Sequence, residues 1–244
     1  MNAKLAVNIS QLLNSVFTDI IRDFVSLIYP NYCAACADAL VKGETLICTR
    51  CASQMPQTNY HLDADNPLKN RLVSRINIRY AMALFRFSKS GRVQGILHSL
   101  KYKQQPELGV MLGNLYGDRL AEAGLKSAFE LIIPVPLHSS RRRKRGYNQS
   151  AKFAEGLAQM LGIPFSDDIM ERKIKTETQT RKTKLNRWQN VNEVFEVRNS
   201  DWVQNKNILL VDDVVTTGAT LEAAGHCLLQ AGCSTLSIAC IAEA

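Results

Sequence analysis

One stretch of the sequence constrains the fold more than any other, and it reads ILLVDDVVTTGAT from Ile208 to Thr220. Its four leading apolar residues, 208–211, predict a strand that is buried on both faces. Two carboxylates follow at the carboxyl end of this strand, and a small-residue loop then opens an apolar helical pattern. Strand, acidic pair, loop and helix in this order predict an open parallel sheet, in which ligands bind beyond the carboxyl ends of the strands.

The parts of this segment have complementary chemistry. Free N–H groups at a helix start attract a phosphate, and a glycine lets the backbone approach it closely. The expected phosphate loop consists of Thr216, Thr217, Gly218, Ala219 and Thr220. Asp212 and Asp213 would repel a phosphate, but as pure acceptors they suit the paired hydroxyls of a sugar. The alternative is a buried strand with an incidental pair of acids, which does not account for the loop and helix that follow.

Along its whole length the segment resembles the 5-phosphoribosyl-1-pyrophosphate motif of type I phosphoribosyltransferases. The resemblance implies that Asp212 and Asp213 hold the 2′ and 3′ hydroxyls of the ribose, and that residues 216–220 cradle its 5′-phosphate. In purine-salvage members an aspartate often stands at the position of Thr216. The resemblance therefore does not extend to purine-base transfer by that route.

A second anion site is expected after another buried strand, LIIPV at residues 131–135. The turn that follows contains Leu137, His138, Ser139 and Ser140, and a basic run, RRRKR, occupies residues 141–145. This arrangement is similar to the pyrophosphate loop of the same fold. Because a guanidinium binds phosphate in a fork, Arg143 and Arg145 are the expected pyrophosphate contacts. The alternative is a solvated loop or a nucleic-acid patch.

A polar, basic segment at residues 172–187 carries seven basic residues and a single acid. Such a segment does not fold on its own, but it could close over a charged substrate and exclude water. Arg172 and Arg187 are its candidate contacts, and Lys101, near the end of an expected helix, is a further candidate. A solvated loop and a solvated helix end fit the sequence equally well. No catalytic residue is predicted, since His138 serves equally well as a turn residue.

Four cysteines lie in two C-x-x-C pairs, Cys33 with Cys36 and Cys48 with Cys51, separated by eleven residues. Two such turns can aim four thiolates at one ion in a tetrahedron, which predicts a structural Zn²⁺ without an open position for substrate. A redox pair and an iron–sulfur cluster are the alternatives. The other three cysteines lie in apolar sequence and are expected to be small buried side chains.

Strands and helices alternate over most of the remaining sequence, which predicts an α/β fold with a doubly wound parallel sheet of the type I phosphoribosyltransferase kind. Strands are expected at 80–87, 131–135, 208–211 and 236–241, and helices at 92–102, 108–123, 149–161 and 220–230. Four segments are expected: an amphipathic helix within 1–29, the zinc module at 30–55, a connector at 56–78 and the phosphoribosyltransferase domain at 79–244. The charges in the first helix argue against a transmembrane segment.

The chain has 30 Lys and Arg against 22 Asp and Glu, a formal charge of +8, which favours anionic partners. Together the motifs resemble the ComF/GntX family, which joins a zinc ribbon to a phosphoribosyltransferase domain and is linked with competence and DNA utilisation. The odd number of cysteines, their spacing and the lack of a convincing secretory signal fit a reducing cytoplasm. The resemblance implies that the protein binds phosphoribosyl pyrophosphate. The expected reaction transfers phosphoribose to an unidentified nitrogen acceptor, while Mg²⁺ neutralises the departing pyrophosphate. The alternative is a non-catalytic competence protein that senses a nucleotide and binds single-stranded DNA weakly. The oligomeric state is not predicted.

Overall fold

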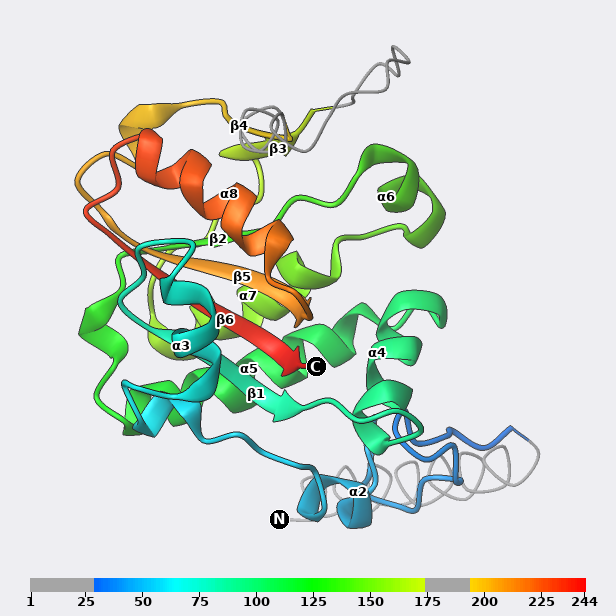
Figure 1. The fold of residues 1–244 in the computed structure, drawn as a ribbon. Coiled ribbons are helices and arrows are strands. Elements are labelled where there is room, and N and C mark those ends of the chain that lie inside the picture. Colours follow the sequence, from blue (N-terminus) through cyan, green and yellow to red (C-terminus); the bar gives the residue numbers. More distant parts are fainter. Residues whose placement is uncertain (1–28, 174–193) are drawn as a thin grey trace, which may run out of the picture. The chain divides into compact units, whose positions relative to one another are not determined.

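The computed structural model describes residues 29–173 and 194–244, and these fall into two compact units, 1–54 and 55–244 (Figure 1). The helix expected within residues 1–29 and the candidate Arg187 lie outside the described residues, apart from Tyr29.

The described part of the first unit is a short loop structure with one helix, α2 (Thr49–Ser53). An antiparallel bridge joins Tyr32 to Ala39, and the Ala34 N–H donates to the Leu46 carbonyl at 2.8 Å. These bonds bring the start and the end of the loop together. Both C-x-x-C pairs therefore lie in a backbone held by its own hydrogen bonds.

The second unit is built on a four-stranded sheet in which every neighbouring pair of strands is parallel. The strands are β1 (Ala81–Arg86), β2 (Leu131–Pro134), β5 (Asn207–Val215) and β6 (Thr235–Glu243), in the order β1-β6-β5-β2. Most of their residues are buried, as expected for strands covered on both faces. The predicted doubly wound parallel fold is confirmed.

Helices cover both faces of this sheet (Figure 1). On one face α5 (Pro106–Glu122) packs against α7 (Gln149–Leu161), and α7 contacts β2 and β5. Glycines allow the two helices this close approach, because a Cβ at Gly113 would lie 2.2 Å from the Phe153 carbonyl oxygen. On the other face lie α3 (Pro67–Val73) and α8 (Ala219–Gln230). A further helix, α4 (Arg92–Tyr102), precedes α5.

The segment expected as a connector, 56–78, contains the 3-10 helix η1 (Tyr60–Leu62) and α3. Leu68 and Leu72 of α3 are fully buried in the core of the second unit. Asn66 caps α3 by accepting from the Lys69 N–H, and its amide donates to the Ala81 carbonyl of β1 at 2.9 Å. This segment is therefore part of the folded unit.

The basic run after β2 is helical, whereas the sequence suggested a loop. It forms α6 (Ser139–Arg145), which begins with the His138 ring accepting from the Ser140 N–H and ends at Gly146 with a positive φ of 80°. The two caps stabilise a helix despite five adjacent positive charges. A small antiparallel sheet, β3 (Met170–Arg172) with β4 (Phe195–Val197), flanks residues 174–193. Two further 3-10 helices are η2 (Lys126–Ala128) and η5 (Ser200–Trp202).

Candidate functional site

The two acids of the expected sugar site lie in the second half of β5 and have different partners. Asp212 Oδ1 accepts a hydrogen bond from the Ser150 hydroxyl at 3.0 Å and from the Asp213 N–H at 2.8 Å. Asp213 forms an ion pair with Lys101, with 2.7 Å between Oδ2 and Nζ. Ser150 comes from the first turn of α7 and Lys101 from the last turn of α4, so three elements meet at the end of β5.

The environment of Asp212 opposes its ionisation. Burial raises its pKa to about 7, and the adjacent Asp213 carboxylate adds to this rise. The Asp213 N–H, the Ser150 hydroxyl and the Lys101 ammonium act in the opposite direction. The site therefore contains a carboxyl group that takes up or releases a proton near neutral pH, next to a carboxylate that is already paired with a cation.

The loop from Thr216 to Thr220 joins β5 to α8, as the sequence predicts. Thr216 and Thr217 are exposed, and Ala219 and Thr220 begin the helix. Gly218 precedes the helix with a φ of 81°, and a Cβ at this position would lie 2.4 Å from Cδ2 of the buried Leu72. Glycine is required here for its conformation and for space. Gly218 itself provides no side-chain cap for the helix, and the Ala219 N–H donates to the Thr217 hydroxyl at 3.5 Å.

The helical form of residues 139–145 decides which arginines reach the site. Arg141 and Arg145 are four residues apart on one face of α6, and both line the cavity beside the acids. Arg143 lies on the other side of the helix, is exposed and does not line the cavity. Arg145 also donates to Gln149 Oε1 at 2.8 Å, and its guanidinium lies 5.6 Å from the ring centre of Tyr102.

The two acids, Lys101 and the two arginines line one cavity of about 170 Å³. Its lining includes the predicted residues Lys101, Leu137, Arg145, Arg172, Asp212, Asp213 and Thr220. It also includes Arg141, Asn148, Gln149 and Ser150, which the sequence analysis did not single out. Asn148 could have been found as a helix cap before an amphipathic pattern, and its side chain does accept from the Ser150 N–H at 3.2 Å. Ser150 belongs to the stretch RGYNQS, residues 145–150, which is one of the segments that resemble the ComF/GntX family, but no role was predicted for it.

The remaining predicted residues lie elsewhere. His138 and Ser140 hydrogen-bond each other at the start of α6, which assigns the histidine to capping. Ser139 lines an adjoining cavity of about 280 Å³ that shares Pro136, Leu137, Asn148 and Arg172 with the first. Thr216 to Ala219 lie outside the lining of both cavities, on the exposed side of the loop apart from the buried Gly218.

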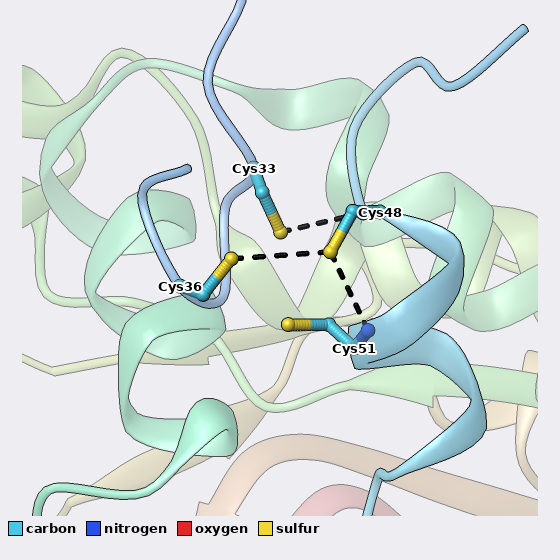
Figure 2. Close-up of side chains that lie close together, drawn as sticks. All are labelled: Cys33, Cys36, Cys48 and Cys51. Carbon is cyan, nitrogen blue, oxygen red and sulfur yellow. Dashed lines mark hydrogen bonds between the residues drawn. The ribbon is translucent and has the colours of Figure 1, made fainter. Parts of the chain in front are cut away.

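The four N-terminal cysteines form a compact cluster (Figure 2). Their sulfur atoms all lie within 4.8 Å of one another, and Cys36 and Cys48 are 3.9 Å apart. Four sulfurs around Zn²⁺ with bonds of about 2.3 Å would lie ~3.8 Å apart, so this cluster fits the ion. The Cys33 sulfur accepts from the N–H groups of Cys48, at 3.3 Å, and Ala35, at 3.4 Å. Although burial opposes ionisation, these bonds lower the pKa of Cys33 to about 7.

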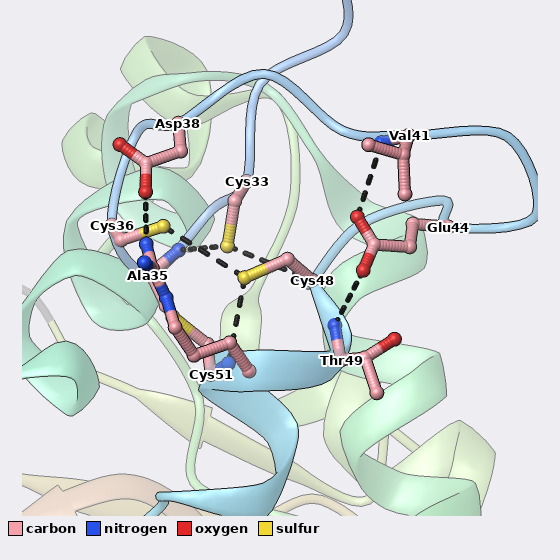
Figure 3. Close-up of polar contacts among 10 residues, drawn as sticks. Cys33, Ala35, Cys36, Asp38, Val41, Glu44, Cys48, Thr49 and Cys51 are labelled. Atoms are coloured by element: carbon pink, nitrogen blue, oxygen red, sulfur yellow. Dashed lines mark hydrogen bonds and ion pairs between the residues drawn. The ribbon is translucent and has the colours of Figure 1, made fainter.

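Polar contacts fix the backbone around the cluster (Figure 3). Glu44 accepts from the N–H groups of Val41, at 3.1 Å, and Thr49, at 2.7 Å, and so closes the loop between the two cysteine pairs. Arg50 pairs with Asp38, joining the two halves of the module on its exposed side. The four sulfur atoms are therefore positioned by the protein itself, an arrangement that could hold a metal ion.

Comparison with known families agrees with this geometry. Residues 148–244 match the family described as the phosphoribosyl transferase domain. The match runs from the start of α7 through β5 and α8 to the end of β6, and thus includes the acids and the loop after them. The second unit therefore carries a phosphoribosyltransferase-type domain. Lys101 and residues 137–145 lie outside the matched range.

Related proteins narrow the assignment. The chain is similar to the DNA utilization protein YhgH of Salmonella typhimurium, with 28% identity over 225 residues, or 89% of this chain and 92% of the relative. It is also similar to competence protein ComFC of Bacillus subtilis, with 26% identity over 202 residues, or 82% and 78%. Competence protein F of Haemophilus influenzae shares 35% identity over 116 residues, or 47% and 51%. Most of the chain is thus similar to proteins named for DNA utilisation and competence, and this similarity supports the resemblance to the ComF family.

In residues 29–173 and 194–244, no helix combines the length and the apolar character needed to cross a membrane.

Proposed function

We propose that this protein binds 5-phosphoribosyl-1-pyrophosphate in the cavity at the end of β5 and transfers its phosphoribosyl group to a nitrogen acceptor. The observation that carries this proposal is the position of Asp212 and Asp213, which face the same cavity as the basic residues and lie next to the loop at the start of α8. The acids would accept from the ribose hydroxyls, and the loop would hold the 5′-phosphate. The pyrophosphate would face Arg141 and Arg145, whose planar donors suit phosphate.

In the proposed reaction the bond between ribose C1 and the pyrophosphate oxygen breaks, and its electron pair leaves with pyrophosphate. A bond from the acceptor nitrogen to C1 forms, and the nitrogen loses a proton. The protein supplies position and charge for this step. Mg²⁺ would neutralise the leaving pyrophosphate, because oxygen-rich phosphate sites favour this ion. We place the acceptor in the adjoining cavity of about 280 Å³. This cavity shares Arg172 with the cavity of about 170 Å³, which is called the ligand cavity from here on.

The first unit, we infer, holds a structural Zn²⁺ through Cys33, Cys36, Cys48 and Cys51. Support comes from the closeness of the four sulfurs and from the N–H donors that favour a thiolate at Cys33. About one zinc per chain is expected in the purified protein. Cys51→Ser should lose the metal, whereas Cys227→Ser, in the second unit, should retain it. A metal-free parent with the first unit still folded would contradict the zinc assignment.

The test of ligand binding is isothermal titration with phosphoribosyl pyrophosphate and Mg²⁺, followed by a screen of nitrogen acceptors for pyrophosphate release. Replacing both Asp212 and Asp213 with Ala removes the ribose acceptors, and a hydrogen bond to a charged group contributes about 1.5–3 kcal/mol. Affinity should therefore fall about tenfold or more. Pyrophosphate lacks the ribose and serves as the control ligand, and its binding should not weaken in the double variant. Undiminished affinity of the double variant for the full ligand would refute the sugar-site assignment.

The names of the relatives indicate the setting of this activity, and we propose that it serves DNA utilisation or competence. Weak, salt-sensitive binding of single-stranded DNA stays a prediction from the net charge of +8.

A further inference from the structure

The last turn of α4 contacts two parts of the ligand cavity lining, the basic segment at the end of α6 and the acids of β5. Tyr147 donates its hydroxyl to the carbonyl of Leu100, and the guanidinium of Arg145 lies over the ring of Tyr102. Between these two contacts, Lys101 reaches to Asp213 on β5. Residues 100–102 thus contact both the basic segment that ends α6 and the acid that the proposed function assigns to the ribose. The backbone of this turn is held in place, while the lysine side chain is a flexible four-carbon stem.

The ion pair between Lys101 and Asp213 occupies atoms that the proposed ligand would need. The lysine side chain is 23% exposed and the aspartate side chain 17% exposed, and both line the cavity with Arg141 and Arg145. The pair neutralises Asp213, which lies directly beside the buried Asp212. A ribose hydroxyl that donates to Asp213 would compete with the lysine for the carboxylate oxygens. Pyrophosphate would at the same time bring several negative charges within reach of the ammonium group.

We propose that Lys101 is an internal counter-ion of Asp213 in the ligand-free protein and transfers to the pyrophosphate when the ligand binds. This inference rests on the proposed function. The transfer needs only rotation of the lysine side chain, because the tethered end of α4 keeps Cα in place. It exchanges one ion pair for another: Asp213 is released to accept from the ribose, and the ammonium pairs with a phosphate oxygen instead. Binding of the sugar and of the pyrophosphate would then be linked through one residue.

The experiment compares Lys101→Met with Lys103→Met, which removes the same charge from the exposed residue that ends α4. Affinities for phosphoribosyl pyrophosphate, pyrophosphate and ribose 5-phosphate are measured at one Mg²⁺ concentration. Lys101→Met should weaken the two pyrophosphate-containing ligands about tenfold or more, since a charged hydrogen bond contributes about 1.5–3 kcal/mol. Ribose 5-phosphate should bind Lys101→Met as well as the parent, or more tightly, because Asp213 is free. Lys103→Met should change none of the three.

Two results would overturn the transfer while leaving the proposed function intact. In one, Lys101→Met weakens ribose 5-phosphate as much as the pyrophosphate ligands, which would make the lysine a fixed support for Asp213. In the other, the parent binds all three ligands and Lys101→Met matches it. A parent protein that binds none of the three would instead refute the proposed function, and the transfer with it. Thermal unfolding of both variants verifies that each is folded.

Discussion

The Ser150 hydroxyl donates to Asp212 Oδ1 at 3.0 Å, and this bond joins the first turn of α7 to the end of β5. The bond crosses from the segment that follows the basic helix α6 to the strand that carries the acids. Ser150 is 4% exposed and Asp212 is half-buried, and both line the cavity. A hydroxyl in this position favours the ionised carboxylate, because it can donate to the charged form.

Ser150→Ala should therefore weaken phosphoribosyl pyrophosphate binding several-fold. Without the hydroxyl, the pKa of Asp212 should rise further, and less of the carboxylate is ionised at neutral pH. Titration calorimetry at pH 7 and pH 8.5 measures the effect, which should shrink at the higher pH. Ser166→Ala is the matched control, because it also removes a bond from serine to aspartate, in this case to Asp168 outside the ligand cavity. Equal losses in both variants would contradict a specific role for Ser150.

The stability of the ligand-free protein should fall as the pH rises through about 7. The pKa of Asp212 is raised from 3.8 in the unfolded chain to about 7 in the fold, so its contribution is fully present below the unfolded value and is lost as the group ionises. Urea unfolding at pH 5, 6, 7 and 8 measures this loss. Asp212→Asn should flatten the dependence, whereas Asp118→Asn, at an exposed position of α5, should leave it unchanged. If the unfolding free energy of Asp212→Asn changed with pH as steeply as that of the parent, other groups would cause the dependence.

The proposal that one face of α6 binds pyrophosphate can be tested with two nearby arginines. Arg141→Gln should weaken pyrophosphate binding about tenfold or more, because it removes a charged donor from the cavity lining. Arg143→Gln removes the same charge from the opposite, exposed face and should have little effect, particularly at high salt. Both variants are titrated with pyrophosphate at two salt concentrations. Salt screens the long-range attraction of the basic helix for pyrophosphate more than it screens a direct contact, so the comparison separates the two effects. If Arg143→Gln weakened pyrophosphate binding more than Arg141→Gln does, Arg143 would be the contact, as the sequence predicts.

Gly218→Ala should destabilise the second unit and weaken binding of ribose 5-phosphate. The alanine would need a positive φ, and its Cβ would displace the buried Leu72 side chain. Gly124→Ala is the matched control, since Gly124 has a φ of 75° but no atom within 4 Å of the added Cβ. The conformational cost of about 1 kcal/mol is expected in both variants, and the contact with Leu72 adds to it only at position 218. Urea unfolding and calorimetry measure the two effects.

Local patterns in the sequence predict much of the fold. The helices at 92–102 and 149–161 have the bounds predicted for them, because an apolar period and clear end signals coincide in each. The strand with the acids was predicted to end at Val211, yet β5 continues to Val215. Pairing with β6 continues through Val215 with Glu243, and such tertiary bonds leave no local trace.

The candidate site was less accessible to sequence reasoning. The acids and the loop after them follow a local motif, but the choice between Arg141 and Arg143 depends on whether the basic run is helical. The sequence left a solvated loop open for this run, whereas the caps at His138 and Gly146 stabilise it as a helix. The partners of the acids come from α4 and α7, far away in sequence. Only the tertiary packing of α4 and α7 brings Lys101 and Ser150 to β5.

The strand order has a consequence for synthesis of the chain. β1 is the first strand of the sheet to be made, but its neighbour in the sheet is β6, which is made last. Until residues 235–243 have left the ribosome, the apolar strand at 81–86 has no strand to pair with. Such non-local pairing is slow, and an unpaired apolar strand invites association with other chains. The nascent protein should therefore depend on chaperones most strongly in the interval between the emergence of β1 and that of β6.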